Sequence, residues 1–551
     1  MIRPHMSAAR KRVLVFAVAL LGVAAISAAP TPEGLPLKGK YALATMFFAG
    51  LLWVTGAFPL PVTALSIPVL LTGMGVYPNM DMALRGFADH LIFLFIAGFM
   101  LANALQKYDI DRRIALRMMS RMGTSPRKLV LSVMLSTAFL SMWVSNTATT
   151  AMMLPIALGV LAQVIGRDEI EAVADAAPAD VDSEVSADGG LGGAGPADAV
   201  DAATTDRDGY TNIQISMLLG TAYAASVGGV GTLIGTPPNA ILAGQLNSLI
   251  GYEIGFAQWL LIGLPIVVVT LPIVWYLLVY QLYPPKLADV GDARAQAQQY
   301  LEEEGDLGPK GSRVAYIFTA TAGLWVLGGL GSFIGPMLPD AWATTIFGGS
   351  GTTVFGTEGH QGLLYYVMVG MLSIPALVLS DTMEWEDLVD IDWGTILLFG
   401  GGIALADALA DTGATKWIAD SVFNSLTGAP IILVVAAVVL LVIFLTEMTS
   451  NTATATIIIP ILISIGSVFA ATLGLTDVAA AVFLSVSGAI AASFAFALPV
   501  ATPPNAIVFG SGYIEQRHMM KAGVILNVIM TAVLTGFIWL LFKFVWPVVL
   551  W

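Results

Sequence analysis

Long apolar runs constrain this chain more than any other feature of its sequence. A transmembrane helix needs about 20 mostly apolar residues to cross the hydrocarbon core of a bilayer. Such runs lie near residues 12–29, 41–59, 60–77, 88–106, 211–251, 257–283, 313–337, 362–380, 393–410, 476–510 and 520–550. The runs at 211–251 and 476–510 are interrupted by polar residues, glycine and proline. The sequence therefore predicts an all-α polytopic membrane protein with about 11 transmembrane helices.

Composition excludes a soluble enzyme and disfavours a membrane-embedded one. Charged residues make up 11% of the 551 residues, against about 25% in soluble domains, too few to coat several such domains. The chain has no cysteine, and its four histidines are scattered without metal-ligand spacing. Disulfides, thiolate metal sites and a Cys nucleophile are therefore excluded, and no His-built metal centre is expected. We expect a protein that is not an enzyme.

Basic residues are distributed unevenly between alternate loops. With the N-terminus in the cytoplasm, 19 Lys and Arg fall inside and 5 outside, which is the positive-inside pattern. This predicts a multi-pass protein of the cell (plasma) membrane, in contact with membrane lipid, with a cytoplasmic N-terminus. An amphipathic cytoplasmic helix is expected near 111–122. Residues 1–29 would also suit a cleaved signal peptide, but we expect them to remain as a first span.

The stretch 167–208 differs from the rest of the chain. It holds 12 acidic residues and 2 arginines, a net charge of −10, and no aromatic residue. Such a composition cannot bury enough apolar surface to fold, so we predict a disordered, acidic cytoplasmic insert. A partner-binding tail is the alternative. The remainder of the chain is near neutral and has no basic patch, so no nucleic-acid partner is expected.

Two segments resemble re-entrant hairpins. Around 129–162 and around 431–469, an apolar arm runs into Ser-Asn-Thr-Ala-Thr (Ser145–Thr149 and Ser450–Thr454), and a second apolar arm follows. We predict that each arm is shorter than the roughly 20 residues that a crossing needs. Polar turn formers join the two arms of each pair. The tips are therefore expected to stop partway across the membrane.

The spacing of the motifs indicates a duplication. The two tips are 305 residues apart, and the segments preceding them, at 94–105 and 398–409, are 304 apart. The two Thr-Pro-Pro-Asn-Ala-Ile segments, starting at Thr236 and Thr502, are 266 apart, and the shortfall of 39 is close to the length of the acidic insert. Five predicted crossings separate the hairpins, an odd number, so the two copies are predicted to be inverted. Inverted repeats with broken helices are how many secondary transporters build a site at the bilayer midplane.

The four predicted breaks in helices are suited to ions. A helix N-terminus offers free N–H groups to a carboxylate, whereas helix C-termini and unwound carbonyls offer oxygen ligands to a hard cation. Ser, Thr and Asn side chains serve both without adding charge, and no Lys or Arg lies in the motifs. An anion bound here would need co-bound cations as well as helix dipoles. The duplication therefore predicts a small anionic substrate and at least two cation sites, one per copy.

Four further residues leave alternatives open. Glu447 lies just before the second tip, where it either serves function or faces solvent at the outer end of the hairpin. Asn103 and Asp407 occupy the same position in the two copies and would equally suit structural contacts between helices. Trp143 is interpreted as a packing residue.

At these residues the sequence resembles the divalent anion:sodium symporter (DASS) family, carriers of succinate, citrate and related anions. Ser141–Thr149, Thr446–Thr454 and both Thr-Pro-Pro-Asn segments are similar to its signatures. The resemblance implies eleven spans plus two hairpins, a homodimer with a scaffold and a mobile transport part, and elevator-type movement.

The resemblance also implies site residues. A first sodium site would be formed by Ser141, Ser145, Asn146 and Gly235, and a second by Thr446, Thr449, Asn451 and Ala501. Substrate carboxylates would meet Ser145, Asn146, Thr147, Thr236, Pro237, Ser450, Asn451, Thr452, Thr502 and Pro503. Na⁺ is the implied coupling ion.

These observations predict the following division of the chain. Residues 1–128 form N-terminal spans that are mainly scaffold, 129–166 the first hairpin, 167–208 the acidic insert, 209–283 a broken helix and the next span, 284–312 a cytoplasmic linker, 313–428 the scaffold spans of the second copy, 429–470 the second hairpin, and 471–551 a second broken helix and the last span.

The leading hypothesis for function is a secondary active transporter that couples sodium to dicarboxylates (succinate, malate, fumarate) by an elevator-type mechanism. The alternatives keep the fold and change the cargo to sulfate or citrate, or the coupling to a sodium-independent dicarboxylate exchanger. A non-transporting membrane scaffold would not need four broken helices at matched positions.

Overall fold

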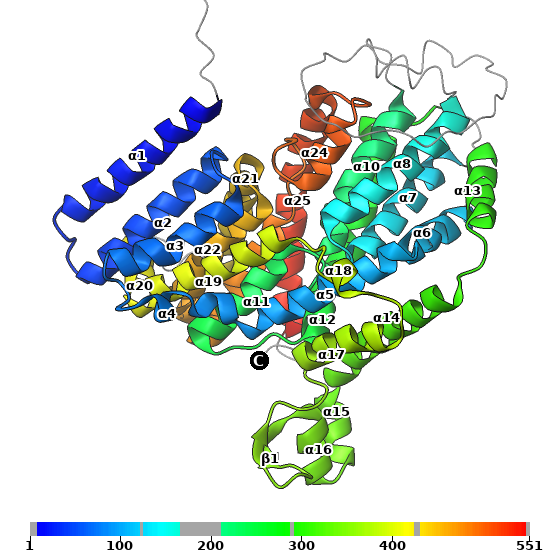
Figure 1. The fold of residues 1–551 in the computed structure, drawn as a ribbon. Helices are drawn as coiled ribbons and strands as arrows, with labels where there is room; N and C mark the ends of the chain where they lie inside the picture. The colour runs from blue at the N-terminus through cyan, green and yellow to red at the C-terminus, as the bar shows by residue number, and fades with distance from the viewer. Residues whose placement is uncertain (1–7, 122–124, 166–210, 287–290, 424–429, 547–551) are drawn as a thin grey trace, which may run out of the picture.

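The computed structural model describes residues 8–121, 125–165, 211–286, 291–423 and 430–546 (Figure 1). The predicted acidic insert at 167–208 lies outside these residues. The described part of the chain consists of helices and one small two-stranded sheet. The predicted all-α membrane architecture is therefore confirmed.

The N-terminal region contains seven helical elements. They are α1 (Ala8–Ala28), α2 (Leu37–Thr55), α3 (Leu60–Gly73), α4 (Met80–Ala83), the 3-10 helix η1 (Arg85–Ala88), α5 (His90–Lys107) and α6 (Ile110–Ser120). Helix α6 covers the segment near 111–122 in which a helix is predicted. It buries Ile110, Leu116 and Met119 along one face, which is the amphipathic pattern.

The first hairpin and the first broken helix follow. The hairpin arms are α7 (Pro126–Ser141) and α8 (Asn146–Ile165), and the broken helix consists of α10 (Asn212–Gly229) and α11 (Pro237–Ile250). Both α7 and α11 begin with proline, whose missing N–H would be unpaired at that position in any case.

The middle region carries a small dome that the sequence analysis does not predict. Its elements are α12 (Phe256–Tyr276), the π-helix η2 (Leu277–Leu282), α13 (Gly291–Glu303), α14 (Pro309–Gly328), α15 (Gly331–Ile334), the 3-10 helix η3 (Gly335–Met337), α16 (Asp340–Phe347), β1 (Gly349–Thr352), β2 (Glu358–His360), α17 (Tyr366–Leu379), α18 (Trp385–Leu388), α19 (Trp393–Asp411) and α20 (Ala414–Phe423). Helix α14 and the helical segment after it are bent by 60°. From this bend α15, α16 and the antiparallel pair β1–β2 project away from the body of the molecule (Figure 1).

The C-terminal region repeats the hairpin and the broken helix. The second hairpin is formed by α21 (Ile431–Met448) and α22 (Asn451–Leu473), the second broken helix by α23 (Asp477–Ala492) and α24 (Pro503–Gly510), and the last span by α25 (Gln516–Phe544). Both hairpin tips and both breaks thus lie where the motifs predict them.

The hairpin arms are longer than predicted. The prediction that every arm is shorter than a crossing holds for α7, with 16 residues, but is wrong for α8 and α22, with 20 and 23. The reason is that Pro155 and Pro460 lie within these helices without ending them. Arm length alone therefore does not distinguish a hairpin from two spans.

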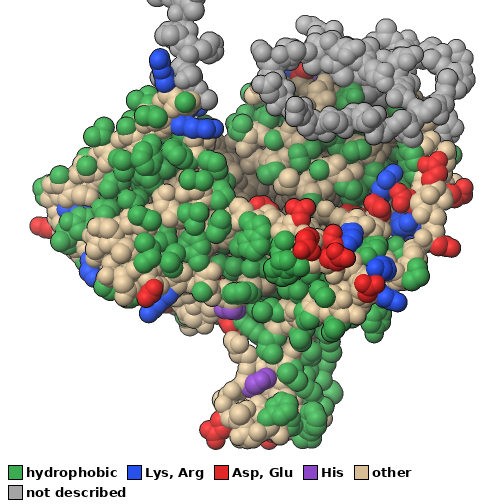
Figure 2. All heavy atoms as spheres, in the orientation of Figure 1, with side chains coloured by type: hydrophobic (Ala, Val, Ile, Leu, Met, Phe, Trp, Pro, Cys, Tyr) green, Lys and Arg blue, Asp and Glu red, His purple; other side chains and the backbone are tan. Residues whose placement is uncertain are grey.

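The described residues include enough apolar helices for a multi-pass membrane protein. Seven helices are long and apolar enough to cross a membrane, or eight if the bent pair after Pro309 counts as one span, and shorter apolar helices such as Leu60–Gly73 accompany them. Apolar side chains cover much of the surface over the N-terminal helices (Figure 2). Phe47, Val54 and Val69 are among the exposed ones, as expected for a surface in contact with lipid.

The hairpins and broken helices pack together in a regular way. Helix α7 packs along α10, and α22 packs along α23, so each hairpin contacts the broken helix of its own copy. In addition, α8 contacts α24, and α11 contacts α22. Each second arm therefore packs against the second half-helix of the other copy, which brings the N-termini of these four helices into one region.

Candidate functional site

The first hairpin tip forms a cluster of oxygen atoms. Ser141 Oγ donates hydrogen bonds to Asn146 Oδ1 at 2.6 Å and to the Ala225 carbonyl at 2.8 Å. The amide atom of Asn146 that faces Ser141 also lies 3.1 Å from the Ala225 carbonyl and 3.2 Å from the Gly235 carbonyl. Two helix ends, those of α7 and α10, and the unwound segment before α11 thus contribute to one buried cluster.

The second tip forms the same cluster from corresponding residues. Thr446 Oγ1 donates to Asn451 Oδ1 at 2.8 Å and to the Ala492 carbonyl at 2.9 Å. The corresponding amide atom of Asn451 lies 3.0 Å from the Ala492 carbonyl and 3.3 Å from the Ala501 carbonyl. The hydroxyl and amide residues are both offset by 305 positions from those of the first cluster. We call these two groups of atoms the first and second oxygen clusters.

The composition of the clusters suits a hard monovalent cation. Each gathers a hydroxyl, an amide and two main-chain carbonyls, with Ser141 and Thr446 fully buried and both asparagines nearly so. With the amide oxygen facing the cluster, all four groups present oxygen, the ligand that hard cations prefer. With the amide nitrogen there, it donates to the same oxygens in place of a cation. The donor set therefore fits Na⁺.

The structure brings together some of the predicted cation ligands and not others. Ser141, Asn146 and Gly235 meet in the first cluster, and Thr446, Asn451 and Ala501 in the second. The Ser145 hydroxyl oxygen instead accepts from Ala148 N at 3.3 Å, within the first turn of α8. Thr449 donates to the Leu445 carbonyl at 3.0 Å and pairs with Thr454. Roles of Ser145 and Thr449 as ligands stay predictions.

The sequence analysis missed the carbonyls of Ala225 and Ala492. A backbone ligand leaves no signature in residue type, so no motif marks them. Their near-equal spacing to the Thr-Pro segments in both copies is a signal that could have found them, because Ala225 precedes Thr236 by 11 residues and Ala492 precedes Thr502 by 10.

Two buried asparagines hold the unwound segments in shape. Asn239 Nδ2 donates to the carbonyls of Gly229 at 3.0 Å and Thr232 at 2.7 Å. Asn505 Nδ2 donates at 3.1 Å to each of the equivalent carbonyls, those of Ala495 and Leu498. These residues end the Thr-Pro-Pro-Asn motifs, so the motif supplies both a helix start and a brace for the segment before it.

We expect Asn239→Ala to lower the initial rate of uptake about tenfold, because two buried carbonyls lose a shared donor and the Gly235 carbonyl loses its fixed position. Initial uptake into liposomes at equal protein content measures this. Asn247→Ala, on the same helix but half-buried, is the matched control and should retain the unmodified rate. Equal rates for the two variants would contradict a bracing role for Asn239.

The predicted substrate contacts lie at the starts of helices. Thr147 and Pro503 are exposed, and Pro237 and Thr452 are partly so, in the first turns of α8, α24, α11 and α22. Ser450 Oγ accepts from Ala453 N at 3.1 Å, and Thr502 Oγ1 accepts from Asn505 N at 3.2 Å, as helix caps. Thr236 lies 3.4 Å from Asn146 Nδ2, which joins the helix start to the first cluster. Free N–H groups at such helix starts favour an anion.

Glu447 does not face solvent. Its side chain is 7% exposed. Its carboxylate accepts hydrogen bonds from the main-chain N–H groups of residues 496, 497 and 498 and from Asn527. The solvent-facing alternative is therefore wrong, and the second unwound segment is what covers this carboxylate.

The other three residues left open make contacts between structural elements. Asn103 donates to the carbonyls of Asp387 and Asp390, and Ser248 on α11 donates to Asp407 on α19. Trp143 packs against Phe256 and Phe318.

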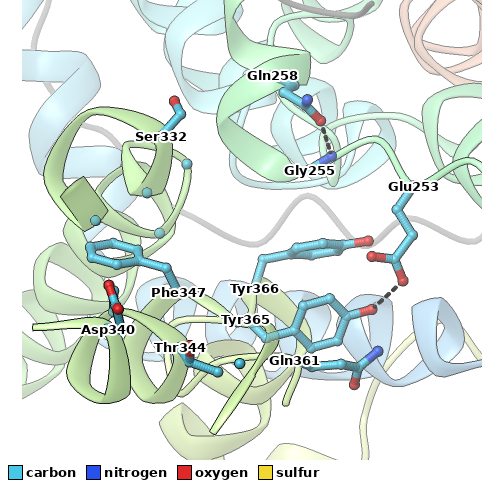
Figure 3. Close-up of a pocket in the computed structure, with 17 residues that line it drawn as sticks. Glu253, Gly255, Gln258, Ser332, Asp340, Thr344, Phe347, Gln361, Tyr365 and Tyr366 are labelled. Carbon is cyan, nitrogen blue, oxygen red and sulfur yellow. Dashed lines mark hydrogen bonds between the residues drawn. The ribbon is translucent and has the colours of Figure 1, made fainter. Parts of the chain in front are cut away.

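A separate pocket of about 750 Å³ opens where the dome meets the body (Figure 3). Its lining includes Glu253, Asp340, Tyr365 and Tyr366, and Tyr365 donates to Glu253 at 3.2 Å. None of the residues lining it is Lys or Arg. Its carboxylates would repel a dianion, so the hairpin tips remain the better candidate for an anion site.

Comparison with known proteins identifies the class. Residues 9–551 match the model of the sodium:sulfate symporter transmembrane region. The chain is 33% identical to the sodium-dependent dicarboxylate transporter SdcS of Staphylococcus aureus (strain USA300), over 94% of this chain and 88% of that one. It is 35% identical to an uncharacterized transporter of Haemophilus influenzae, over 90% of each chain.

The fold also resembles a solved transporter. The crystal structure of the YdaH transporter of Alcanivorax borkumensis superimposes with a TM-score of 0.52 at 12% identity, covering 84% of this chain and 87% of that one. The protein is a multi-pass membrane transporter and not an enzyme. It belongs to the sodium:sulfate symporter family, the divalent anion:sodium symporters that its motifs resemble.

Proposed function

We propose that this protein couples Na⁺ to the uptake of C4-dicarboxylates such as succinate, malate and fumarate. The single observation that carries the proposal is the pair of matching oxygen clusters at the two hairpin tips. The name of the Staphylococcus aureus relative, a sodium-dependent dicarboxylate transporter, supports both the ion and the cargo.

Each oxygen cluster binds one Na⁺, so at least two ions accompany one substrate. The clusters carry no Lys or Arg to neutralise an anion. A dicarboxylate at the adjacent helix starts therefore depends on the cations for its charge balance, since two like charges in a low-dielectric site repel strongly. This dependence is the physical basis of coupling.

The substrate carboxylates bind between the tips, at Ser145, Asn146 and Thr147 of one and Ser450, Asn451 and Thr452 of the other. Thr236, Pro237, Thr502 and Pro503 complete the site at the starts of the two half-helices. The crosswise packing of α8 on α24 and of α11 on α22 supports this arrangement, because it brings the four helix starts into one region.

The movement is of the elevator type. The hairpins and broken helices form the mobile transport part of two inverted copies, and the remaining spans form the scaffold of a homodimer. The protein lies in the plasma membrane with its N-terminus in the cytoplasm, as the distribution of basic residues favours.

Sulfate is the second candidate cargo, because the description of the matching family names sulfate. Neutral donors at helix starts serve a sulfate as well as a carboxylate. Citrate as cargo and sodium-independent exchange remain weaker alternatives.

The test is uptake of labelled succinate into liposomes under an inward Na⁺ gradient, with a K⁺ gradient as control. We expect uptake with Na⁺ alone, and competition by unlabelled malate and fumarate but not by sulfate. Uptake of equal rate with K⁺ would support an exchanger. Competition by sulfate but not by malate would replace the proposed cargo.

A further inference from the structure

We infer that Glu447 is a positioning residue that supplies negative charge to the second oxygen cluster and holds its unwound segment in place. This inference rests on the proposed function. It makes the two cation sites unequal, with the charge at one of them only.

Hydrogen bonds to Glu447 fix three consecutive peptide groups. Its Oε1 accepts from Phe496 N at 2.6 Å and Ala497 N at 2.8 Å, and its Oε2 accepts from Leu498 N at 3.0 Å. A fourth donor is Asn527 Nδ2 on α25, at 2.6 Å from Oε1. The carboxylate thus ties the tip of the second hairpin to the unwound segment between α23 and α24 and to the last span.

The same unwound segment is held from its carbonyl side by neutral groups. Asn505 donates to the carbonyls of Ala495 and Leu498, and Tyr223 donates to the carbonyl of Phe496 at 2.8 Å. The peptide of Phe496 is therefore held at both its N–H and its C=O. Glu447 contributes the N–H side of this frame, which ends at Ala501, the carbonyl of the second cluster.

The charge of Glu447 is not cancelled by its own partners. All four donors are neutral amides, so they stabilise the carboxylate without neutralising it. A buried anion of this kind is costly unless a positive charge lies close by. The adjacent residue in the chain is Thr446, whose hydroxyl belongs to the second cluster, so a cation bound there offsets the charge.

The first copy lacks this feature. The position equivalent to Glu447, 305 residues earlier, is Met142. There the Thr232 hydroxyl donates to the Met142 carbonyl, so the tip and the unwound segment are joined by a neutral contact. The first cluster is therefore neutral, and the second is next to one negative charge. We expect the second site to bind Na⁺ more tightly.

The test compares the Na⁺ dependence of succinate uptake in four variants of the full-length protein. Glu447→Gln removes the charge while it keeps an acceptor oxygen, and Glu447→Asp keeps the charge with a shorter side chain. Asn527→Ala removes one neutral donor. Glu386→Gln, at an exposed acid on α18, is the matched control for the loss of a charge.

We expect Glu447→Gln to raise the half-saturating Na⁺ concentration about tenfold, which is what a unit charge several ångströms from a cation contributes at an effective dielectric constant of about 20. Glu447→Asp and Asn527→Ala should stay within about threefold of the unmodified protein, and Glu386→Gln should match it. A shift for Glu447→Asp as large as that for Glu447→Gln would overturn the charge argument. So would a Glu447→Gln value within twofold of the unmodified one.

A second readout covers variants that fold but do not transport. Na⁺ stabilises a protein that binds it against thermal unfolding, without substrate, in proportion to the occupancy of the site. In detergent, Glu447→Gln should need about tenfold more Na⁺ for the same stabilisation, and an unchanged titration would overturn the inference. Uptake by the unmodified protein that is independent of Na⁺ would instead contradict the proposed function itself.

Discussion

Replacing Asn146 or Asn451 by alanine should abolish most sodium-driven uptake. Each asparagine is the side chain that joins a hydroxyl and two main-chain carbonyls in its oxygen cluster. Alanine removes one cation ligand and leaves buried carbonyls without a partner, a loss of about 1–3 kcal/mol for a buried polar group. We expect the initial rate of succinate uptake to fall at least tenfold in each variant and to background in the double variant.

The measurement is initial uptake into liposomes at matched protein content and saturating Na⁺. Asn247→Ala controls for the loss of an asparagine elsewhere in the transport part. Excess Na⁺ should restore part of the uptake of each single variant, because the remaining three oxygens still form a weakened site. Unchanged uptake in Asn146→Ala and Asn451→Ala would contradict the account of both clusters.

Adding one methyl group at Gly228 should destabilise the fold by several kcal/mol. Gly228 lies in the last turn of α10, where that helix packs on α7. A Cβ at this position would lie 2.5 Å from Ala138 Cα and 2.7 Å from its carbonyl carbon, and both are backbone atoms that cannot rotate away. Overpacking of a rigid contact typically costs about 1–3 kcal/mol and more where backbone must shift.

Thermal unfolding in detergent, followed by uptake, measures the effect of Gly228→Ala. We expect a fall in the unfolding temperature and loss of most uptake, since the Ala225 carbonyl of the first cluster lies one turn earlier. Gly323→Ala is the matched control: it is also a helical glycine, and a Cβ there would meet no atom within 4 Å. Gly323→Ala should be at least as stable as the unmodified protein, because alanine favours a helix. Similar unfolding temperatures for the two variants would contradict the close approach of α7 and α10.

Much of the architecture is predictable because the chain carries its motifs twice. Two Ser-Asn-Thr tips and two Thr-Pro-Pro-Asn segments at matched offsets mark where helices end and begin, and the structure has its breaks there. Arm length was predicted less well. A proline inside a packed helix is tolerated where neighbouring groups satisfy the freed carbonyl, so Pro155 did not end α8.

Features that depend on tertiary contact lay beyond the sequence. The carbonyls of Ala225 and Ala492 are ligands by position and not by residue type, so no pattern identifies them. The direction of Glu447 depends on which segment covers the second tip, and a sequence does not specify that. The dome around β1 and β2 was missed because residues 348–362 are rich in Gly and Thr and have neither apolar periodicity nor the length of a span.

Simultaneous measurement of ²²Na⁺ and labelled succinate fluxes into the same liposomes tests the central claim most directly. The account predicts that Na⁺ enters only when succinate is present, with at least two ions per dicarboxylate. It also predicts that Asn451→Ala lowers both fluxes together. Succinate flux without accompanying Na⁺ flux, or a Na⁺ flux that is the same with and without succinate, would contradict a pair of cation clusters coupled to one anion site.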